Sequence, residues 1–381
     1  MRQWTPITVA IAIALTATAA ARGSESPPLA TLARLDPARV TVSGISSGGF
    51  FAHQFHVAFS SLVEGAGIIA GGPYACAEQI PWALGFNPLA RVTIALGVCT
   101  RYARGAFDPF DLWLPDAPDA EEAIAAVRAE HAADRIDDPA NLADDRVWLF
   151  LGDADGIVPL ATMQALEGVY AGLGLTDPAL EFERNAEANH GLPIEEFTGT
   201  TEHAKLGCGD YGPPFLIDCD FDAAERLLRH LYPAGFAEEP GIPDPDRLAA
   251  FDQSEFFDAD DPSVSLAATG FLYVPETCRD DAPPGEPCRL HVAFHGCQQY
   301  AGLIGDDFYM DGGYNRWAEA NRIVVLYPQT TPWERALDPT GLTANPKGCW
   351  DWWGYSGPDY FRREGQQMRA VHGMIERLLP Q

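Results

Sequence analysis

Short runs of hydrophobic residues alternate along the chain with longer segments in which hydrophobic positions recur every three or four residues. The short runs are typical of buried strands, and they occupy residues 39–43, 67–71, 146–151, 180–184, 270–274, 289–294 and 322–327. The longer segments predict helices at residues 49–62, 121–135, 160–173, 223–231, 314–321 and 365–379. Nearly continuous apolar strands that alternate with helices indicate an α/β fold, in which helices cover both faces of a mostly parallel sheet.

The length of the chain leaves its division into domains open. It has 381 residues, 47% of them hydrophobic, which is enough to bury a large core. Two or three domains would fit this length, and so would one large α/β domain with insertions. A stretch rich in proline and acidic side chains, residues 238–246, could separate two halves of the chain.

Acidic residues far outnumber basic ones. There are 54 Asp and Glu against 25 Lys and Arg, which gives a formal net charge of −29. Nucleic-acid binding requires a basic surface that displaces counterions from phosphate, so we expect no nucleic-acid partner. Anionic membrane surfaces are disfavoured for the same reason, and no stretch is long and apolar enough to span a bilayer, so we expect no membrane partner either.

The first residues have the features of an export leader. Arg2 precedes an apolar run at residues 7–15, and residues 17–21 offer the small side chains of an A-x-A cleavage site. The run is too short for a membrane-spanning helix. We expect residues 1–21 to be a signal peptide and the mature protein to be secreted, to the medium or to the periplasm.

The eight cysteines, an even number, indicate disulfides in an exported chain. Pairing each cysteine with its nearest neighbour in the sequence gives Cys76–Cys99, Cys208–Cys219, Cys278–Cys288 and Cys297–Cys349. Many other pairings of eight cysteines are possible. Zinc sites need closely spaced Cys-x-x-Cys pairs, which the sequence lacks, so we expect no metal.

The pentapeptide Gly44-Ile-Ser-Ser-Gly48 is typical of a nucleophile elbow. It lies between the predicted strand at residues 39–43 and the predicted helix at residues 49–62. A sharp strand-to-helix turn strains the backbone of its central residue, so small neighbours are needed on both sides. We predict that Ser46 is a nucleophile at the carboxyl edge of the sheet. The backbone N–H of Ser47 would then face the developing oxyanion.

A serine nucleophile needs a base, and the base needs an acid that orients it. The loop after the predicted strand at residues 146–151 contains Asp153 and Asp155. We favour Asp155, because the apolar residues that follow it would hold its loop against the core, and Asp153 remains the alternative. His190 lies in the loop after the predicted strand at residues 180–184. The order serine, acid, histidine is that of an α/β-hydrolase.

The sequence His295-Gly-Cys-Gln298 follows the predicted strand at residues 289–294. In α/β-hydrolases a turn of this type after a strand donates a backbone N–H to the oxyanion. We therefore predict that the N–H groups of Cys297 and Ser47 hold the tetrahedral oxygen. A disulfide at Cys297 is compatible with this role, because it would make the turn rigid.

These motifs stand in an unusual order along the chain. In most α/β-hydrolases the strand with the oxyanion turn precedes the nucleophile strand, whereas here His295 comes long after Ser46. The apolar strand at residues 322–327, which normally lies between them, also comes late. Joining the end of the chain to the strand before Ser46 would restore the usual order. The sequence thus predicts a circularly permuted α/β-hydrolase, and it favours a single catalytic domain over residues 22–381.

Together, five motifs make the chain resemble extracellular poly(3-hydroxybutyrate) depolymerases with the permuted, type 2 catalytic domain. The motifs are Gly44-Ile-Ser-Ser-Gly-Gly49, Gly152-Asp-Ala-Asp-Gly-Ile-Val158, Asn189-His-Gly-Leu-Pro193, His295-Gly-Cys-Gln298 and Gly348-Cys-Trp-Asp-Trp-Trp353. They extend over nearly all of the mature chain. The resemblance implies a serine esterase that attacks short-chain polyesters, with Ser46, Asp155 and His190 as its triad and Cys297 as an oxyanion donor.

The resemblance also indicates where the substrate binds. It implies an aromatic residue near the substrate in the segment 349–353, above all Trp353. We expect Trp352 and His295 to lie at the same site, whereas at least one of the three tryptophans of the segment should pack in the core. Polymer-degrading members often carry a separate substrate-binding domain after the catalytic domain. We expect none here, because the sequence ends directly after the last predicted helix.

The expected reaction is ester hydrolysis through an acyl-enzyme, which requires neither a metal nor an organic cofactor. The expected substrate is a poly(3-hydroxybutyrate)-type polyester or its oligomers, and we expect the enzyme to be a monomer. An alternative with the same chemistry is an exported carboxylesterase that cleaves small esters, or feruloyl or acetyl groups on polysaccharide. A serine peptidase and a non-catalytic binding protein on a hydrolase scaffold are further alternatives.

Overall fold

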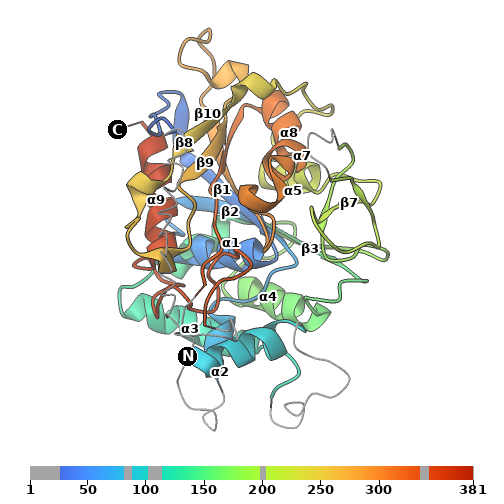
Figure 1. The fold of residues 1–381 in the computed structure, drawn as a ribbon, viewed down its shortest axis with the longest axis vertical. Coiled ribbons are helices and arrows are strands. Elements are labelled where there is room, and N and C mark those ends of the chain that lie inside the picture. Colours follow the sequence, from blue (N-terminus) through green and yellow to red (C-terminus); the bar gives the residue numbers. More distant parts are fainter. Residues whose placement is uncertain (1–25, 81–87, 102–113, 198–202, 335–342, 381) are drawn as a thin grey trace, which may run out of the picture.

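An eight-stranded sheet forms the centre of the protein (Figure 1). The structure is a computed structural model that describes residues 26–80, 88–101, 114–197, 203–334 and 343–380. From edge to edge the strands follow the order β4-β3-β2-β1-β10-β11-β9-β8. Their bounds are β1 Leu35–Ile45, β2 Val63–Ile69, β3 Arg146–Gly152, β4 Leu180–Asn185, β8 Leu248–Asp252, β9 Thr269–Tyr273, β10 Cys288–Phe294 and β11 Ile323–Tyr327. The predicted leader, residues 1–21, lies outside the described residues.

Helices cover both faces of this sheet. The α-helices of the described residues are α1 Ser47–Ala58, α2 Pro88–Ile94, α3 Ala120–Ala132, α4 Leu160–Gly172, α5 Ala223–Leu231, α6 Ala301–Ile304, α7 Asp307–Asp311, α8 Tyr314–Asn321 and α9 Gln366–Leu378. Successive residues of a strand point to opposite faces. In β1, Ser43 is hydrogen-bonded to Tyr314 of α8, whereas Gly44 lies against Gly48 of α1. Helices α8 and α1 therefore lie on opposite faces, as the α/β prediction requires.

Most strands of the sheet are parallel. The six strands from β4 to β11 in the sheet order run parallel to their neighbours. The two remaining strands, β9 and β8, are antiparallel and form one edge. The predicted mostly parallel sheet is thus confirmed, with one antiparallel edge.

The arrangement of the strands is that of a circularly permuted α/β-hydrolase. The first strand, β1, lies in the middle of the sheet and pairs with the late strand β10, so that Gly44 is opposite Phe294. The backbone N–H of Leu32, just before β1, donates a hydrogen bond to the carbonyl oxygen of Leu378 at the end of α9, at 2.9 Å. A chain joined at this point would pass through β8, β9, β10 and β11 before it reached β1, which is the usual order.

Several parts of the fold were missed by the hydrophobic pattern, among them the short helices α6 and α7. The edge strand β8 buries only Phe251, so its sequence lacks an apolar run. A second, three-stranded sheet consists of β5 Leu192–Pro193, β7 Leu216–Asp218 and β6 Leu206–Gly207, which are too short to show a period. Helix α2 continues into a π-helical turn, Ala95–Cys99, that the sequence analysis did not include. The stretch 238–246 does not separate two sheets, because the strands after it join the same sheet as β1.

The structure contains the four disulfides that nearest-neighbour pairing gave, Cys76–Cys99, Cys208–Cys219, Cys278–Cys288 and Cys297–Cys349. All eight cysteines are paired. Three of the bonds close loops of 23 residues or fewer in sequence separation, whereas Cys297–Cys349 joins positions 52 residues apart. Four disulfides fit a protein that folds in an oxidising compartment.

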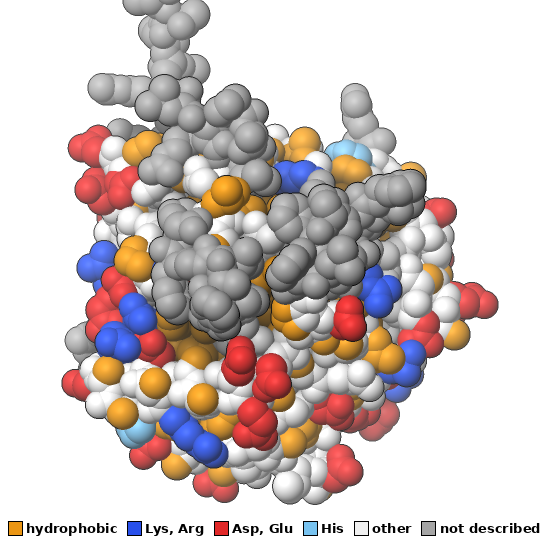
Figure 2. Space-filling view, turned by 90° about the horizontal axis from the view of Figure 1, so that it is seen from below, with side chains coloured by type: hydrophobic (Ala, Val, Ile, Leu, Met, Phe, Trp, Pro, Cys, Tyr) orange, Lys and Arg blue, Asp and Glu red, His pale blue; other side chains and the backbone are white. Residues whose placement is uncertain are grey.

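The surface reflects the acidic composition. Figure 2 shows the protein from below, with acidic side chains spread around the face and hydrophobic side chains exposed between them. Among the described residues, no helix has both the length and the hydrophobicity that crossing a bilayer would require.

Candidate active site

The backbone at Ser46 makes the sharp turn of a nucleophile elbow. Ser46 has φ +56° and ψ −123°, a conformation that non-glycine residues rarely adopt, and it precedes the first residue of α1. A β-carbon on Gly44 would lie 2.2 Å from the carbonyl oxygen of Gly48. One on Gly48 would lie 2.4 Å from the carbonyl oxygen of His295. Both positions therefore require glycine if β1 is to turn into α1 here.

A continuous chain of hydrogen bonds joins Ser46, His190 and Asp155. The Oγ atom of Ser46 lies 2.9 Å from Nε2 of His190. On the other side of the ring, Nδ1 of His190 lies 2.8 Å from Oδ2 of Asp155. The other carboxylate oxygen of Asp155 accepts hydrogen bonds from the backbone N–H groups of Ile157 and Val158, at 2.7 and 2.9 Å. The structure thus brings together the three residues predicted as nucleophile, base and acid.

The loops that carry Asp155 and His190 are held against each other. A β-carbon on Gly152, at the end of β3, would lie 2.0 Å from the carbonyl oxygen of Ala188, so the two loops touch through their backbones. Next to His190, Asn189 accepts a hydrogen bond from the His190 N–H at 2.7 Å and donates one to Gly209 at 3.0 Å. This contact links the histidine loop to the segment closed by the Cys208–Cys219 disulfide.

The alternative acid, Asp153, faces away from the histidine. Its carboxylate forms an ion pair with Arg184 of β4, and 37% of its side chain is exposed. By contrast, only 1% of the Asp155 side chain is exposed. The geometry therefore favours Asp155 over Asp153 as the partner of His190.

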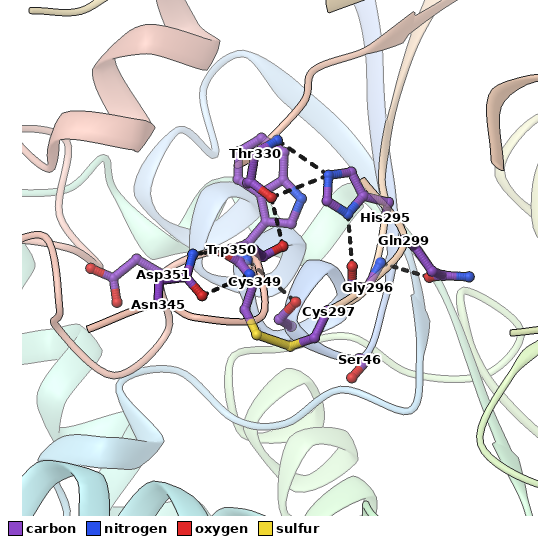
Figure 3. Close-up of a disulfide and its surroundings, with 12 residues drawn as sticks. Ser46, His295, Gly296, Cys297, Gln299, Thr330, Asn345, Cys349, Trp350 and Asp351 are labelled. Atoms are coloured by element: carbon purple, nitrogen blue, oxygen red, sulfur yellow. Dashed lines mark hydrogen bonds between the residues drawn. A yellow bond between two sulfur atoms is a disulfide. The ribbon is translucent and has the colours of Figure 1, made fainter. Parts of the chain in front are cut away.

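The two residues predicted as oxyanion donors lie close to Ser46. Ser47 is the first residue of α1, where a backbone N–H has no partner within the helix. Cys297 belongs to the turn after β10, and this turn lies against the nucleophile, since a β-carbon on Gly296 would be 3.3 Å from Cβ of Ser46. Figure 3 shows the Cys297–Cys349 disulfide beside Ser46. Both Ser47 and Cys297 line the same cavity as Ser46.

His295 does not lie where the sequence analysis put it. We expected it at the substrate-binding site, but its side chain is fully buried and it is not among the residues that line the cavity. Its ring is hydrogen-bonded to Gly296 at Nδ1 and to Thr330 at Nε2 (Figure 3). Burial lowers the pKa of His295 to about 4, so the ring is neutral at pH 7. The sequence shows that His295 directly follows a strand, but it does not determine on which side of the turn after β10 its ring lies.

A cavity of about 330 Å³ opens beside Ser46 and His190. Most of its lining is apolar or aromatic, and it includes Trp352 and Trp353, the two tryptophans expected near the substrate. The ring of Trp352 stacks on Phe50 of α1, with centroids 4.1 Å apart. Such a lining suits a substrate with hydrophobic groups on both sides of an ester.

Trp350, the remaining tryptophan of this segment, belongs to the core. It is fully buried and packs against the rings of Phe51, Phe294 and His295. The expectation that at least one of the three tryptophans packs in the core therefore agrees with the structure.

Asp351 shapes the tryptophan segment, and the sequence analysis did not single it out. It is buried, and its carboxylate accepts backbone N–H groups from Trp353, Gly354 and Tyr355 and both donors of Ser356. Burial raises the pKa of this carboxyl, although these donors oppose the shift. An Asp followed by Gly and Ser within five residues is a signal for such a turn.

Gln299 is a second residue that sequence reasoning missed. Its Oε1 accepts the Gly296 N–H at 2.7 Å, and its Nε2 donates to the carbonyl oxygen of Pro214 at 3.0 Å. The side chain thus connects the turn after β10 to the cavity wall at Phe215. Nothing in the local sequence indicates the contact with Pro214, because that residue lies 85 positions away.

Within the described part of the chain, no three His, Cys, Asp or Glu side chains are grouped so that they could hold a metal ion. The candidate site consists instead of a hydroxyl, an imidazole, a carboxylate and backbone N–H groups. These groups are sufficient for nucleophilic acyl transfer.

The chain is similar to known proteins in both sequence and structure. No family model matches it. It is 33% identical over 347 residues to a poly(3-hydroxybutyrate) depolymerase of Delftia acidovorans, with 91% of this chain and 60% of that protein covered. It is 30% identical over 351 residues to a polyhydroxybutyrate depolymerase of Talaromyces funiculosus, with 91% of both chains covered. The chain therefore spans less than two thirds of the first relative and nearly all of the second.

Two solved structures have the same fold over almost the whole chain. A PHB depolymerase from Penicillium funiculosum is 28% identical and superimposes with a TM-score of 0.75, over 92% of this chain and 98% of that one. A serine-to-alanine variant of a PHB depolymerase, complexed with an R3HB trimer, is 27% identical, with a TM-score of 0.73 and the same coverage. Together with the relatives of known sequence, they show that the chain belongs to the polyhydroxybutyrate depolymerase family.

Proposed function

We propose that the protein is a serine esterase that hydrolyses poly(3-hydroxybutyrate)-type short-chain polyesters or their oligomers through an acyl-enzyme. The observation that carries this proposal is the set of hydrogen bonds that joins Ser46 to His190 and His190 to Asp155. Ser46 and His190 also line a largely apolar cavity. The membership of the polyhydroxybutyrate depolymerase family supports the same substrate class.

In the first half of the reaction, Ser46 attacks the carbonyl carbon of an ester. Nε2 of His190, 2.9 Å from the hydroxyl, accepts its proton as the new bond forms. Asp155 holds the ring in the tautomer with the proton on Nδ1 and stabilises the imidazolium. The backbone N–H groups of Ser47 and Cys297 donate hydrogen bonds to the negative oxygen of the tetrahedral intermediate.

In the second half, the alcohol leaves and water regenerates the enzyme. The imidazolium of His190 gives its proton to the departing alkoxide oxygen as the C–O bond breaks, so that an alcohol leaves and an ester between Ser46 and the acyl group remains. A water molecule then gives a proton to the same nitrogen and attacks this ester. The second tetrahedral intermediate collapses to a free carboxylic acid and the serine hydroxyl.

The cavity supports a short-chain polyester as the substrate. A 3-hydroxybutyrate unit carries one methyl branch and no charge within the polymer, and such a unit matches a lining with few polar groups. Trp352 and Trp353 provide flat apolar surfaces beside Ser46. Among the solved structures of similar fold, one holds an R3HB trimer.

We further propose that the protein is exported and that it acts as a monomer without a cofactor. Its four disulfides are those of a protein that matures in an oxidising compartment, either the periplasm or the medium. The predicted signal peptide at residues 1–21 is the second argument for export. One catalytic domain over residues 22–381 is sufficient for the reaction, because the site takes its groups from both halves of the chain.

The test is release of soluble products from amorphous poly(3-hydroxybutyrate). The wild type should release 3-hydroxybutyrate and its oligomers, Ser46→Ala should release none above background, and Ser61→Ala, at an exposed serine beyond α1, should match the wild type. Cleavage of p-nitrophenyl butyrate without polymer hydrolysis would instead support the carboxylesterase alternative. If neither substrate were cleaved, the esterase proposal would be wrong.

A further inference from the structure

The hydrogen bonds of His295 fix which of its ring nitrogens carries the proton. The backbone N–H of Thr330 lies 3.2 Å from Nε2, and an N–H can only donate, so Nε2 must be the acceptor. The carbonyl oxygen of Gly296 lies 2.7 Å from Nδ1, and a carbonyl can only accept, so Nδ1 must carry the proton. The ring is therefore a neutral Nδ1–H tautomer that bridges two backbone segments.

The carbonyl group that His295 holds belongs to the peptide unit of the predicted oxyanion donor. The C=O of Gly296 and the N–H of Cys297 are parts of one peptide bond, which is planar and trans. In a trans peptide these two groups point in opposite directions, so fixing one fixes the other. Figure 3 shows His295 on one side of this turn and Ser46 on the other. A carbonyl directed at His295 therefore directs the Cys297 N–H away from the core.

We propose that His295 is a positioning residue, which sets the orientation of the Cys297 N–H toward the oxyanion formed at Ser46. The inference rests on the proposed function, because it needs Cys297 to be an oxyanion donor. It assigns to His295 a role without substrate contact, in agreement with its complete burial.

The Gly296 carbonyl oxygen also accepts the backbone N–H of Gln299, at 3.2 Å, so this turn contact and His295 together orient the peptide unit. The preceding amide, the N–H of Gly296, is hydrogen-bonded to Oε1 of Gln299 at 2.7 Å and is directed into the protein. The next one, the N–H of Gln298, donates to the carbonyl oxygen of Lys347 at 2.8 Å. Of the three consecutive N–H groups in this turn, the one between them belongs to Cys297, whose residue lines the cavity.

The environment of His295 keeps its ring in the required state. The side chain is fully buried, and burial lowers its pKa to about 4, so the ring stays neutral near pH 7. A protonated ring would lose its acceptor at Nε2. A hydrogen bond to a carbonyl also polarises the peptide and makes its N–H a stronger donor. His295 can thus both orient and strengthen the Cys297 donor.

Two amide substitutions allow the two hydrogen bonds of the His295 ring to be tested one at a time, because each can keep one bond and loses the other. The side-chain nitrogen of Asn is bonded to Cγ, as Nδ1 of His is, so His295→Asn can still donate to Gly296. The amide of Gln reaches the position of Nε2, so His295→Gln can accept from Thr330 but cannot hold the Gly296 carbonyl. Both variants are polar and neutral, and both remove an aromatic ring from the core.

Hydrolysis of p-nitrophenyl butyrate measures the effect without depending on the polymer. Removing an oxyanion donor typically lowers the rate 10²–10³-fold. His295→Gln should therefore lower kcat by about 10²-fold with little change in KM, whereas His295→Asn should stay within about tenfold of the wild type. The affinity for an alkyl trifluoromethyl ketone, whose serine adduct carries the same oxyanion, should fall in proportion to kcat/KM.

The outcomes distinguish this inference from the proposed function. Equal losses in the Asn and Gln variants, or a loss of kcat without a matching loss of ketone affinity, would indicate a structural role and overturn it. A wild type without any activity dependent on Ser46 would contradict the proposed function and, with it, this inference.

A measurement on the wild type keeps the proposal testable if both variants misfold. In a long-range ¹H–¹⁵N spectrum of histidine-labelled protein, His295 should give the signals of a neutral Nδ1–H ring that does not change between pH 6 and 8. A ring protonated only at Nε2 would show that His295 does not donate to the Gly296 carbonyl, and would refute the proposal.

Discussion

Gly48 in α1 lies in direct backbone contact with the carbonyl oxygen of His295. A β-carbon at this glycine would come within 2.4 Å of that oxygen and of the carbonyl oxygen of Phe294. The contact joins the nucleophile elbow to the end of β10, so the distance between Ser46 and the turn after β10 depends on the absence of a side chain.

Gly48→Ala should therefore destabilise the protein and displace the elbow from β10. Overpacking of this kind costs about 1–3 kcal/mol, and here backbone rather than a flexible side chain must move, so we expect about 3 kcal/mol or more. Gly156→Ala is the matched control, since a β-carbon there would meet nothing within 4 Å. Urea unfolding with the disulfides intact measures both. Equal stability of the two variants would contradict the predicted contact.

Two neighbouring acids provide a test of the triad. Asp155→Asn should lower kcat for p-nitrophenyl butyrate by about 10⁴-fold, because an amide favours the wrong tautomer of His190. Asp153→Asn removes only a partly exposed ion pair with Arg184, so kcat should stay close to that of the wild type. If the Asp153 variant showed the larger loss, the assignment of the acid would have to be exchanged.

The parts of the site that could be predicted from the sequence are those whose geometry is set by residues close together in the chain or by the ends of parallel strands. The elbow at Ser46 could be predicted because a strand, a helix and two glycines at fixed spacing dictate one backbone turn. Asp155 and His190 could be placed because parallel strands end at the same edge of a sheet, so that loops after β3 and β4 meet there.

Residues that act through distant contacts could not be found in this way. Gln299 binds the carbonyl oxygen of Pro214, and the link between them exists only after the small sheet has packed beside the turn. His295 was placed at the substrate for a similar reason: the motif fixes its position after β10 but not its partner Thr330, which follows β11. Asp351 could be predicted only in part. Its hydrogen-bond partners in the turn are close in sequence, whereas its burial depends on segments that are distant in sequence.

The tryptophans of the segment 349–353 should divide into one that binds substrate and one that stabilises the fold. Trp353→Ala should raise KM for a 3-hydroxybutyrate trimer by about tenfold with little change in Tm, because the ring lines the cavity and is only partly buried. Trp350→Ala removes a fully buried ring from the core and should cost about 3–5 kcal/mol. A Trp353 variant with unchanged KM for the trimer would exclude this side chain from the binding site.

Two disulfides should differ in their effect on catalysis. Replacing Cys297 and Cys349 together by alanine should lower kcat as well as stability, because Cys297 lines the cavity and its turn touches Ser46. Replacing Cys278 and Cys288 together should leave kcat unchanged, since their bond closes a loop before β10. Chain entropy predicts a loss of about 4 kcal/mol for the first pair and about 3 kcal/mol for the second. A comparable loss of kcat in both double variants would argue against a specific role for the turn.

The buried ring of His295 should make the protein less stable in weak acid. Burial lowers its pKa from 6.5 to about 4, so the unfolded chain binds a proton between these values that the folded protein does not. The contribution is fully present above pH 6.5 and is lost as the pH falls toward 4. Between pH 7.5 and 5 this one group should remove about 2 kcal/mol of the free energy of unfolding.

His295→Asn lacks this group and should lose that much less stability over the same pH interval, although it is less stable than the wild type at pH 7.5. The comparison needs urea unfolding of both proteins at each pH with the disulfides intact, so that the pH-dependent difference is separated from the constant cost of the substitution. The loss in His295→Asn would not be zero, because His291 is also buried and burial lowers its pKa to about 3. Parallel pH dependences in the two proteins would mean that the ring of His295 takes up its proton in the folded state as readily as in the unfolded chain. In that case the ring would be the neutral bridge between Gly296 and Thr330 only above about pH 6.5, and the Cys297 N–H would lose this support at lower pH.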